Sequence, residues 1–176
     1  DGKLDLLANE SVSNTGKFMV YMGNQSSVQN YFNVQQNYFE GSKTDLFTTG
    51  DFNIDGFMDV VSTSSLGITV FLNNTNGTFT SSAKYFSVYT DAKKITSNDY
   101  NNDGFLDLLI DYGPSFGSSN NPGGRLRLFT GNGDGTFTYA SLYPEALNLG
   151  NSFSTDINGD GSLDVIGNYR GSICSL

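Results

Sequence analysis

The chain has 176 residues, 37% of them hydrophobic, which is enough to build the core of one or two domains. It has no histidine and one cysteine, Cys174, which excludes an intrachain disulfide, Cys/His zinc sites and Ser-His-Asp or Cys-His catalysis. Its 18 acidic and 9 basic residues give a net charge of −9 with no cluster of Lys and Arg, so nothing indicates a nucleic-acid partner. No apolar run is long enough to span a membrane.

Read in chain order, the sequence predicts short β-strands, because no segment shows a helical hydrophobic period. In each unit a first strand leads into an acidic loop, a second leaves it, and a tight turn joins a third strand to a fourth. The predicted strands are Phe18–Met22 and Val28–Val34; then Asp45–Gly50, Met58–Thr63, Ile68–Asn73 and Thr78–Phe86; then Lys94–Asn98, Leu106–Asp111, Arg125–Thr130 and Thr136–Leu142; and finally Ser152–Thr155 and Leu163–Asn168.

The acidic loops share one spacing, Asp-x-Asn-x-Asp-Gly-x-x-Asp. Three complete copies begin at Asp51, Asp99 and Asp156, and the chain opens inside a fourth, Asp1-Gly2-Lys3-Leu4-Asp5. Oxygen ligands at alternating positions, with a glycine that lets the backbone turn, suit a hard cation such as Ca²⁺. Eleven of the 18 acidic residues lie in these loops (nine in the complete copies, two in the opening one). Bound Ca²⁺ therefore explains the negative charge better than a basic partner does.

The spacing differs from that of an EF-hand. The twelfth loop positions are Ser62, Ile110 and Gly167, so the bidentate Glu of an EF-hand is missing. The closing acid stands at position nine and is followed at once by runs such as Val60-Val61, which are typical of strands. The alternative is a set of Asx-rich turns without metal, which would cluster carboxylates with no cation.

The loops recur at the period of propeller blades. Their fifth positions, Asp1, Asp55, Asp103 and Asp160, are 54, 48 and 57 residues apart, and periods of about 40 to 50 residues are typical of propellers or solenoids. Asn76-Gly77 and Asp134-Gly135 supply the positive φ angles that hairpin turns need. The predicted fold class is all-β, with blades of four antiparallel strands.

Two motifs of the second unit are the run Gly50–Val61 and the later Phe71-Leu72-Asn73 with Asn76-Gly77-Thr78-Phe79. Together they resemble the FG-GAP/VCBS repeats of integrin α-subunit-type propellers. The resemblance implies that each loop binds Ca²⁺ through side-chain oxygens at positions one, three, five and nine and a backbone carbonyl at position seven. The implied ligands are Asp51, Asn53, Asp55, Phe57 and Asp59; Asp99, Asn101, Asp103, Phe105 and Asp107; Asp156, Asn158, Asp160, Ser162 and Asp164; and, incompletely, Asp1, Lys3 and Asp5.

The chain is expected to be one propeller segment with units at about 1–44, 45–93, 94–150 and 151–176, or about three and a half blades. A closed propeller has four to eight blades. The last unit is expected to stop about two strands in. The open sheet edges indicate a partial segment of a larger propeller or, alternatively, pairing between copies.

The resemblance places protein or glycan ligands on the face opposite the metal loops. Its loops are expected at Asn9–Gly16, Ser64–Gly67 and Gly113–Gly124, with Glu40–Thr44, Ser87–Lys93 and Tyr143–Gly150 between blades. In the longest, Phe116 with Arg125 and Arg127 nearby forms either a contact patch or part of a plain insertion. Asn-x-Ser/Thr sequons predict glycosylation at Asn9, Asn24, Asn73 and Asn76.

The sequence thus predicts a secreted or cell-surface, Ca²⁺-stabilised propeller segment for adhesion, recognition or scaffolding, and no enzyme. Two alternatives stay open: a repeat unit of an extracellular filament or surface assembly, and the accessory propeller of a secreted carbohydrate-active enzyme. Cys174 is expected to be a buried thiol or to pair with a cysteine outside this sequence.

Overall fold

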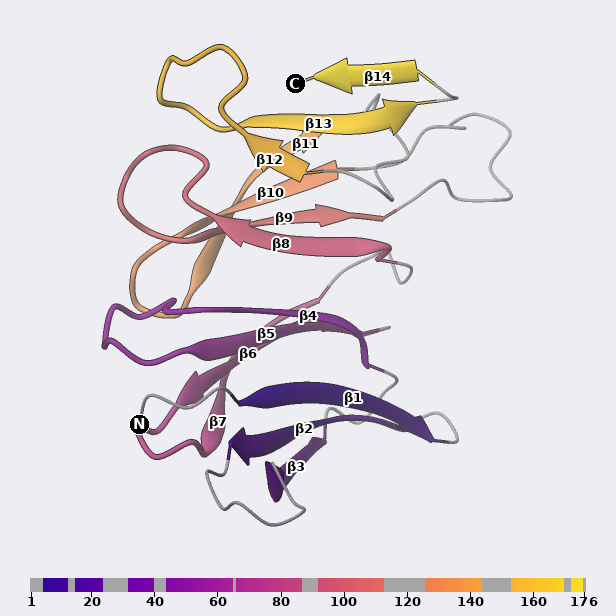
Figure 1. Ribbon diagram of the computed structural model, residues 1–176, viewed down its shortest axis with the longest axis vertical. Helices are drawn as coiled ribbons and strands as arrows, with labels where there is room; N and C mark the ends of the chain where they lie inside the picture. Colours follow the sequence, from indigo (N-terminus) through magenta and orange to yellow (C-terminus); the bar gives the residue numbers. More distant parts are fainter. Residues whose placement is uncertain are drawn as a thin grey trace.

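The computed structural model describes residues 5–12, 15–23, 32–39, 44–64, 66–86, 92–112, 126–143, 153–169 and 172–175. Within these ranges every regular element is a β-strand, and the strands form four antiparallel sheets (Figure 1). The predicted all-β class is confirmed, and the sheets are blades of a partial β-propeller that does not close. This described part contains no helix long and apolar enough to cross a membrane.

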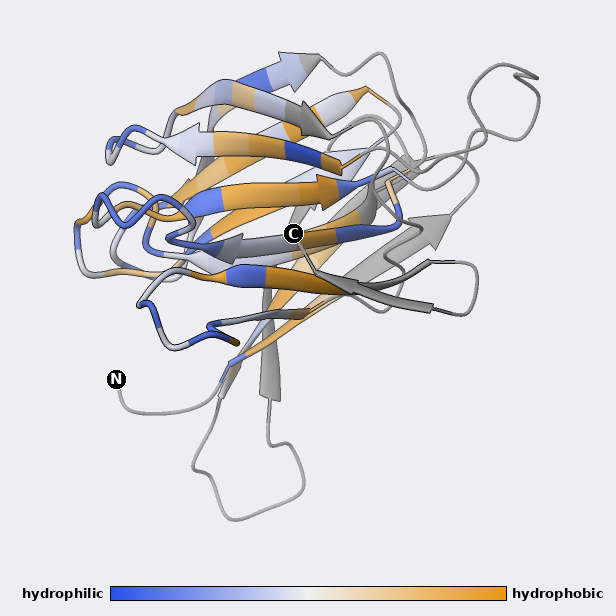
Figure 2. Ribbon diagram, turned by 90° about the horizontal axis from the view of Figure 1, so that it is seen from above, coloured by the Kyte–Doolittle hydropathy of each residue, from blue (hydrophilic) through white to orange (hydrophobic). Residues whose placement is uncertain are grey.

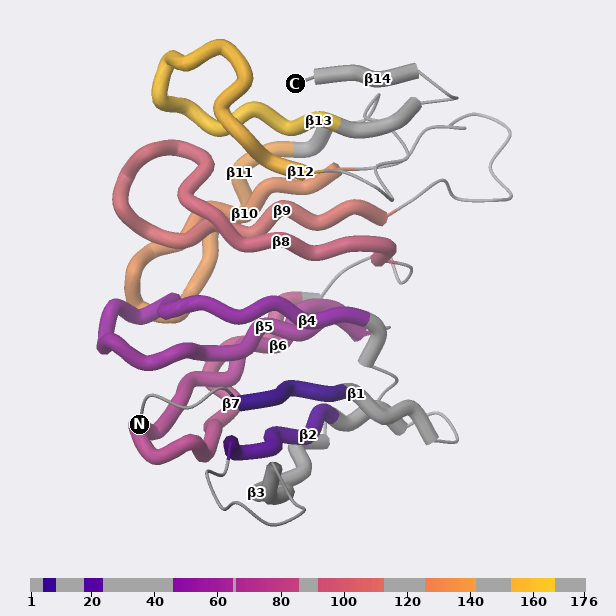
Figure 3. The backbone as a smooth tube through the Cα atoms, viewed as in Figure 1, coloured from indigo at the N-terminus to yellow at the C-terminus, as the bar shows by residue number. Residues whose placement is uncertain are grey.

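Each sheet is a meander in which consecutive strands pair side by side. The first sheet contains β1 (Leu6–Val12), β2 (Thr15–Gly23) and β3 (Phe32–Phe39); the second β4 (Thr44–Gly50), β5 (Asp59–Ser64), β6 (Gly67–Asn73) and β7 (Phe79–Phe86); the third β8 (Lys94–Asn98), β9 (Asp107–Asp111), β10 (Leu126–Gly131) and β11 (Phe137–Tyr143); and the last β12 (Phe153–Thr155), β13 (Asp164–Tyr169) and β14 (Ser172–Ser175). The sheets stack in chain order, with the acidic loops together along one side (Figures 1 and 3).

The core lies between neighbouring sheets, and the second strand of a blade contributes to two interfaces. Successive side chains of a strand point to opposite faces. Val60 therefore packs in a cluster with Phe18 of the first sheet, whereas Val61 packs in a cluster with Leu108 of the third. Burial on both faces explains why these second strands carry adjacent apolar residues, Val60-Val61 in β5 and Leu108-Leu109-Ile110 in β9, rather than strictly alternating ones. Figure 2 shows this pattern, with hydrophobic strands leading to hydrophilic loops.

Hydroxyl groups join the first strand or the acidic loop of one blade to the first strand of the next. The Oγ1 atom of Thr48 in β4 lies 2.9 Å from the Oγ atom of Ser97 in β8. The hydroxyl of Tyr100 lies 2.9 Å from Ser154 Oγ in β12. These bonds satisfy polar side chains where adjacent blades meet and help to set the blades' relative positions.

Strand β3 of the first sheet, which corresponds to the fourth strand of a complete blade, lies further along the chain than predicted. The prediction was Val28–Val34, but β3 runs from Phe32 to Phe39, and residues 28–31 lie outside the described residues. The pairing of β2 with β3 joins Lys17 to Phe39 and Gly23 to Phe32. This unit lacks the Asn/Asp-Gly-Thr-Phe turn that marks the start of the fourth strand in the next two units. The position of β3 therefore follows from its pairing with β2 and not from a local sequence signal.

Three further expectations need correction. Asn9–Gly16 was expected to be a loop, but β1 extends to Val12 and β2 begins at Thr15. Ser64–Gly67 was also expected to be a loop, but Ser64 pairs with Gly67 at the end of a tight hairpin. The last sheet has a third strand, β14, beyond the two that were predicted. A strand extends as far as the neighbouring strand offers hydrogen-bond partners to its backbone. The local sequence does not show where those partners end.

We expect Leu108→Ala to lower the free energy of unfolding by about 2–5 kcal/mol, because Leu108 is fully buried between two sheets. Leu66→Ala is the matched control: Leu66 is 56% exposed and should change stability by no more than about 0.5 kcal/mol. Chemical denaturation of both variants measures the difference. Equal losses would contradict the assignment of the core to the interface between sheets.

Candidate metal centre

The three complete acidic loops have one hydrogen-bond pattern. In the first, Asp51 Oδ1 accepts the N–H of Asp55 at 3.1 Å, and Asp51 Oδ2 accepts the N–H of Gly56 at 2.9 Å. The Oδ1 atom of Asn53 also accepts the N–H of Asp55, at 3.2 Å. The corresponding bonds of the first aspartate are Asp99 with Asp103 and Gly104 (3.1 and 2.9 Å) and Asp156 with Asp160 and Gly161 (3.2 and 2.8 Å). One sequence spacing thus specifies one loop geometry.

Two positions of each loop are left-handed. Position six is always glycine, with φ between 85° and 88° at Gly56, Gly104 and Gly161. Position four is also left-handed, with φ 59° at Ile54. That conformation is strained for a β-branched residue. The sequence predicted the need for glycine at position six but gave no sign of this second turn, because position four holds Ile, Asn or Gly.

The closing aspartate connects the loop to the third strand of its blade. Asp59 is fully buried, its Oδ2 accepts the N–H of Phe52 at 3.0 Å and its Oδ1 accepts the N–H of Asn73 at 2.8 Å. Asp107 is also fully buried and accepts the corresponding N–H groups of Tyr100 and Gly131, at 2.9 and 2.8 Å. In addition to the metal-ligand role predicted for it, this residue therefore bridges two strands and a loop.

Burial raises the pKa of the Asp59 carboxyl above its usual value, although the N–H groups of Asn73 and Phe52 lower it. The nearby carboxylates of Asp55 and Asp51 raise it further. Burial also raises the pKa of Asp107. The charged groups that shift the pKa of Asp59 are thus all negative, which is the environment that a cation relieves.

The donor chemistry of these loops fits a hard cation. Carboxylate and amide oxygens are ligands that Ca²⁺ takes, and each carboxylate oxygen that accepts one N–H retains a second lone pair. Within the ranges the structure describes, no three His, Cys, Asp or Glu side chains are grouped closely enough to hold a metal by themselves. The ligand set predicted from the sequence adds the Asn53 amide oxygen and the Phe57 backbone carbonyl to the acids, and it stays a prediction.

The opening copy is only partly described. Asp1 and Lys3 lie outside the described residues, whereas Asp5 is exposed and its Oδ1 accepts the N–H of Gly23 at 2.8 Å. This bond corresponds to the bond between Asp59 and Asn73.

The predicted glycosylation sites fall in different surroundings. Asn9 lies in β1, and Asn24 lies outside the described residues. Asn73 is half-buried and its Nδ2 donates to the Met58 carbonyl at 3.1 Å, whereas Asn76 is exposed in the hairpin turn. A glycan on Asn73 would have to replace that bond, so the geometry favours Asn76. All four sites remain predictions.

The residues expected on the opposite face are mostly not described. Gly113–Gly124, with Phe116, and Arg125 lie outside the described residues. The guanidinium of Arg127 lies 5.6 Å from the ring centroids of both Tyr112 and Tyr139. The ligand patch proposed from the sequence therefore stays a prediction.

Sequence reasoning missed the role of position two. Phe52 is buried between the second and third sheets, where its ring meets Phe137 edge to face at 5.5 Å. Its carbonyl accepts the N–H of Gly135 at 2.9 Å. In the next loop the same position is Tyr100. The sequence pattern that could have shown this role is an aromatic residue at position two of two loops. This position contributes a core contact between two polar positions of the loop.

In calcium-free buffer with chelator, we expect Asp107→Ala to leave two backbone N–H groups without acceptors, at about 1–3 kcal/mol each. Asp107→Asn keeps one acceptor oxygen and removes the buried charge, so it should lose less stability. Denaturant unfolding of the two variants gives the comparison. Similar losses for both substitutions would mean that the bridging bonds contribute little.

Residues 51–110 match the FG-GAP-like repeat family. Among solved structures, the chain is similar to an Agrocybe aegerita lectin described by its specific recognition of non-reducing terminal N-acetylglucosamine, with a TM-score of 0.60 and 20% sequence identity. The match covers 93% of this chain but 46% of the lectin, so the chain spans about half the length of that structure, and the likeness shows the fold alone. No curated protein matches the sequence significantly. The chain therefore carries, over residues 51–110, a repeat of the FG-GAP-like family within a partial β-propeller.

Proposed function

We propose that this chain is a Ca²⁺-stabilised propeller segment of a secreted or cell-surface protein, and that it acts in recognition rather than catalysis. The observation that carries the proposal is the common hydrogen-bond geometry of the three complete loops, in which several carboxylates lie within one nonapeptide and the closing aspartate is buried in two of the three, Asp59 and Asp107. Bound Ca²⁺ would supply compensating positive charge to these oxygens. The chain's own contribution is to hold the oxygens at fixed positions between two strands.

The loops act on architecture and not on a reaction. Each lies between the first two strands of its blade, and in the second and third sheets its closing aspartate accepts an N–H from the end of the third strand, in Asp59 and in Asp107. Stabilising this corner stabilises the blade from which the loops on the opposite face extend. Loops on a rigid scaffold are common binding sites.

A glycan is the ligand class that we propose for this module. Its support is the likeness of the fold to that of a lectin described by its recognition of terminal N-acetylglucosamine. The acids outside the metal loops form no obvious catalytic pair in the sequence, which favours binding over cleavage.

Calcium at about 100 times its Kd should raise the free energy of unfolding by about 2.7 kcal/mol per site, and chelation should remove this gain. For a chain of this size each kcal/mol corresponds to about 2–4 °C in Tm. Differential scanning calorimetry with calcium and with EDTA provides the measurement. A Tm that EDTA leaves unchanged would reject the proposed metal role.

Asp55→Asn and Asp134→Asn form a matched pair for this experiment, because each removes one negative charge from an exposed aspartate. Asp134 lies in a hairpin turn whose counterpart in the preceding blade has Asn76, so asparagine fits there. The calcium-dependent rise in Tm should decrease in Asp55→Asn and persist in Asp134→Asn. A decrease of the same size in both would indicate a general charge effect.

Glycan binding is tested on the intact chain against immobilised oligosaccharides that differ only in the terminal sugar. We expect retention on those ending in N-acetylglucosamine, with weaker retention after calcium removal. Equal retention on all terminal sugars, or on none, would reject the glycan proposal and leave the calcium proposal untouched.

A further inference from the structure

The sequence contains three Asn-Gly pairs, namely Asn76-Gly77, Asn132-Gly133 and Asn158-Gly159. In such a pair the backbone nitrogen of the glycine can attack the side-chain amide carbon of the asparagine, because glycine has no side chain to hinder the approach. The attack closes a succinimide ring. The three pairs share this chemistry but differ in how the fold holds the amide.

The amide carbonyl of Asn76 is polarised by two donors. Its Oδ1 accepts the backbone N–H of Thr78 at 3.0 Å and the hydroxyl of Thr78 at 2.6 Å. The bond to the N–H two residues further on is an Asx turn, which folds the side chain back along the peptide group of Gly77. Donors on Oδ1 also stabilise the negative charge that this oxygen gains when the nitrogen attacks.

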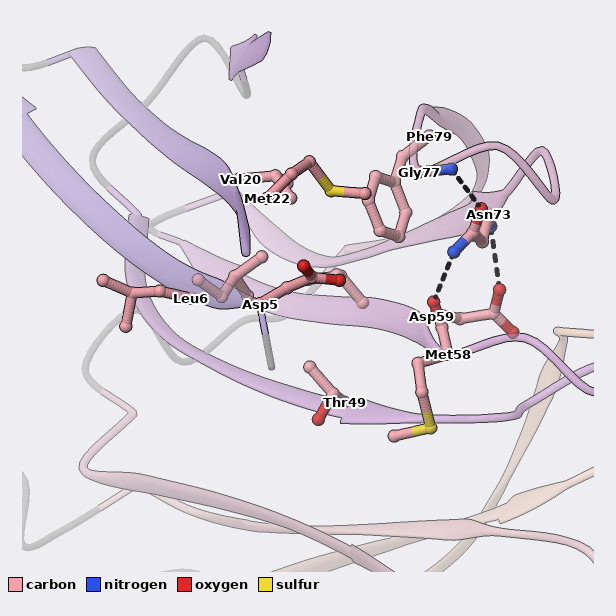
Figure 4. Close-up of a pocket in the computed structure, with 12 residues that line it drawn as sticks. Asp5, Leu6, Val20, Met22, Thr49, Met58, Asp59, Asn73, Gly77 and Phe79 are labelled. Carbon is pink, nitrogen blue, oxygen red and sulfur yellow. Dashed lines mark hydrogen bonds between the residues drawn. The ribbon is translucent and has the colours of Figure 1, made fainter. Parts of the chain in front are cut away.

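The leaving group and the nucleophile of this pair are weakly held. Asn76 is exposed, and among the described residues no acceptor binds its Nδ2, the atom that leaves. The N–H of Gly77 donates to Asn73 Oδ1 at 3.3 Å, a long bond that an attacking nitrogen can give up (Figure 4). Asn76 therefore combines an activated carbonyl with an unpaired leaving group.

The equivalent turn of the next blade stabilises a negative charge at the same place. There Asp134 stands where Asn76 does, and its carboxylate accepts both the N–H and the hydroxyl of Thr136. These bonds lower the pKa of the Asp134 carboxyl below its usual value. Gly77 and Gly135 have φ of 78° and 80°, so an aspartate fits this turn without a change of backbone at the glycine.

The amide of Asn132 is held away from its glycine. Its Nδ2 donates to Thr136 Oγ1 at 2.9 Å, and its Oδ1 accepts the hydroxyl of Thr138 at 3.1 Å. The side chain thus spans the hairpin instead of folding along the peptide group of Gly133. Both of its amide atoms would have to give up a bond before the ring could close.

Asn158 forms an Asx turn, but among carboxylates. Its Oδ1 accepts the N–H of Asp160 at 2.8 Å, and its Nδ2 donates to Asp160 Oδ2 at 2.9 Å. The N–H of Gly159 donates to Asp156 Oδ1 at 2.6 Å, a short charge-assisted bond. The leaving group and the nucleophile are both engaged here, and the nearby carboxylates disfavour a further negative charge.

We propose that Asn76 is a site of spontaneous modification, at which water converts the side-chain amide to a carboxyl through a succinimide. The Gly77 nitrogen bonds to Asn76 Cγ, the bond from Cγ to Nδ2 breaks, and Nδ2 leaves as ammonia with the proton that the Gly77 nitrogen gives up. Water then adds to either ring carbonyl and opens the ring, which leaves aspartate or isoaspartate at position 76. No electrons are transferred. The inference does not depend on the proposed calcium or glycan function.

The test is incubation of the intact, unglycosylated chain at mildly alkaline pH, followed by peptide mass spectrometry that separates aspartate from isoaspartate. In the folded chain we expect Asn76 to convert at least about tenfold faster than Asn132 and Asn158. In denaturant, where the folded contacts are lost, the three rates should become similar. Equal rates in the folded chain, or a difference that persists in denaturant, would overturn the inference.

Thr78→Val tests the hydroxyl donor. Valine keeps the backbone N–H and the shape of threonine but removes one bond to Asn76 Oδ1, so conversion should slow by about two- to tenfold. Thr136→Val, in the equivalent turn of the next blade, is the matched control and should leave the Asn76 rate unchanged. Faster conversion in Thr78→Val would mean that the hydroxyl restrains the amide, which contradicts the proposed activation. The comparison of the three sites needs no variant, so it does not rely on one folding.

Discussion

The second and third sheets depend on a buried carboxylate at the end of their acidic loops. Asp59 and Asp107 have no exposed surface, and each accepts one N–H from its loop and one from the end of the third strand. A buried carboxylate costs free energy unless it is hydrogen-bonded or paired with a cation. Because the neighbouring charges are also negative, the backbone N–H groups of Phe52 and Asn73 are the groups that stabilise the charged form of Asp59.

This constraint explains why the loops repeat while other segments vary. The oxygens at positions one, three and five accept N–H groups of their own loop, so their spacing specifies the geometry locally. Position two serves a different purpose, since Phe52 extends into the interface with the next blade. One nonapeptide therefore combines a polar loop with a contact that positions the neighbouring sheet.

The interfaces between sheets supply the packing that the loops cannot. Second strands such as β5 and β9 are buried on both faces and share their apolar side chains between two neighbours. One sheet alone could not bury both faces of these strands, because each face is covered by a different neighbouring sheet. The apolar side chains of the second strands are therefore buried only when neighbouring sheets stack on each other.

The sequence alone determined the features that rest on local chemistry. The spacing of Asp, Asn and Gly specified the loops, and Asn76-Gly77 and Asp134-Gly135 specified the hairpin turns, where Gly77 and Gly135 have φ of 78° and 80°. Apolar runs such as Val60-Val61 placed the second strands. These signals act within a few residues, so no tertiary contact is needed to interpret them.

The features that depend on distant partners could be assigned only from the arrangement of the sheets in space. Strand β3 pairs with β2 so that Lys17 lies opposite Phe39, which places β3 further along the chain than predicted. The sequence could not predict this position, because that unit lacks the Asn/Asp-Gly-Thr-Phe turn of the next two units. The burial of Asp59 and the place of Phe52 between sheets follow from the position of Asn73 and Phe137, 14 and 85 residues further along the chain. Such contacts depend on how the sheets stack. A contact stabilises the fold only when both of its residues have been brought together, so the local sequence around either residue does not predict it.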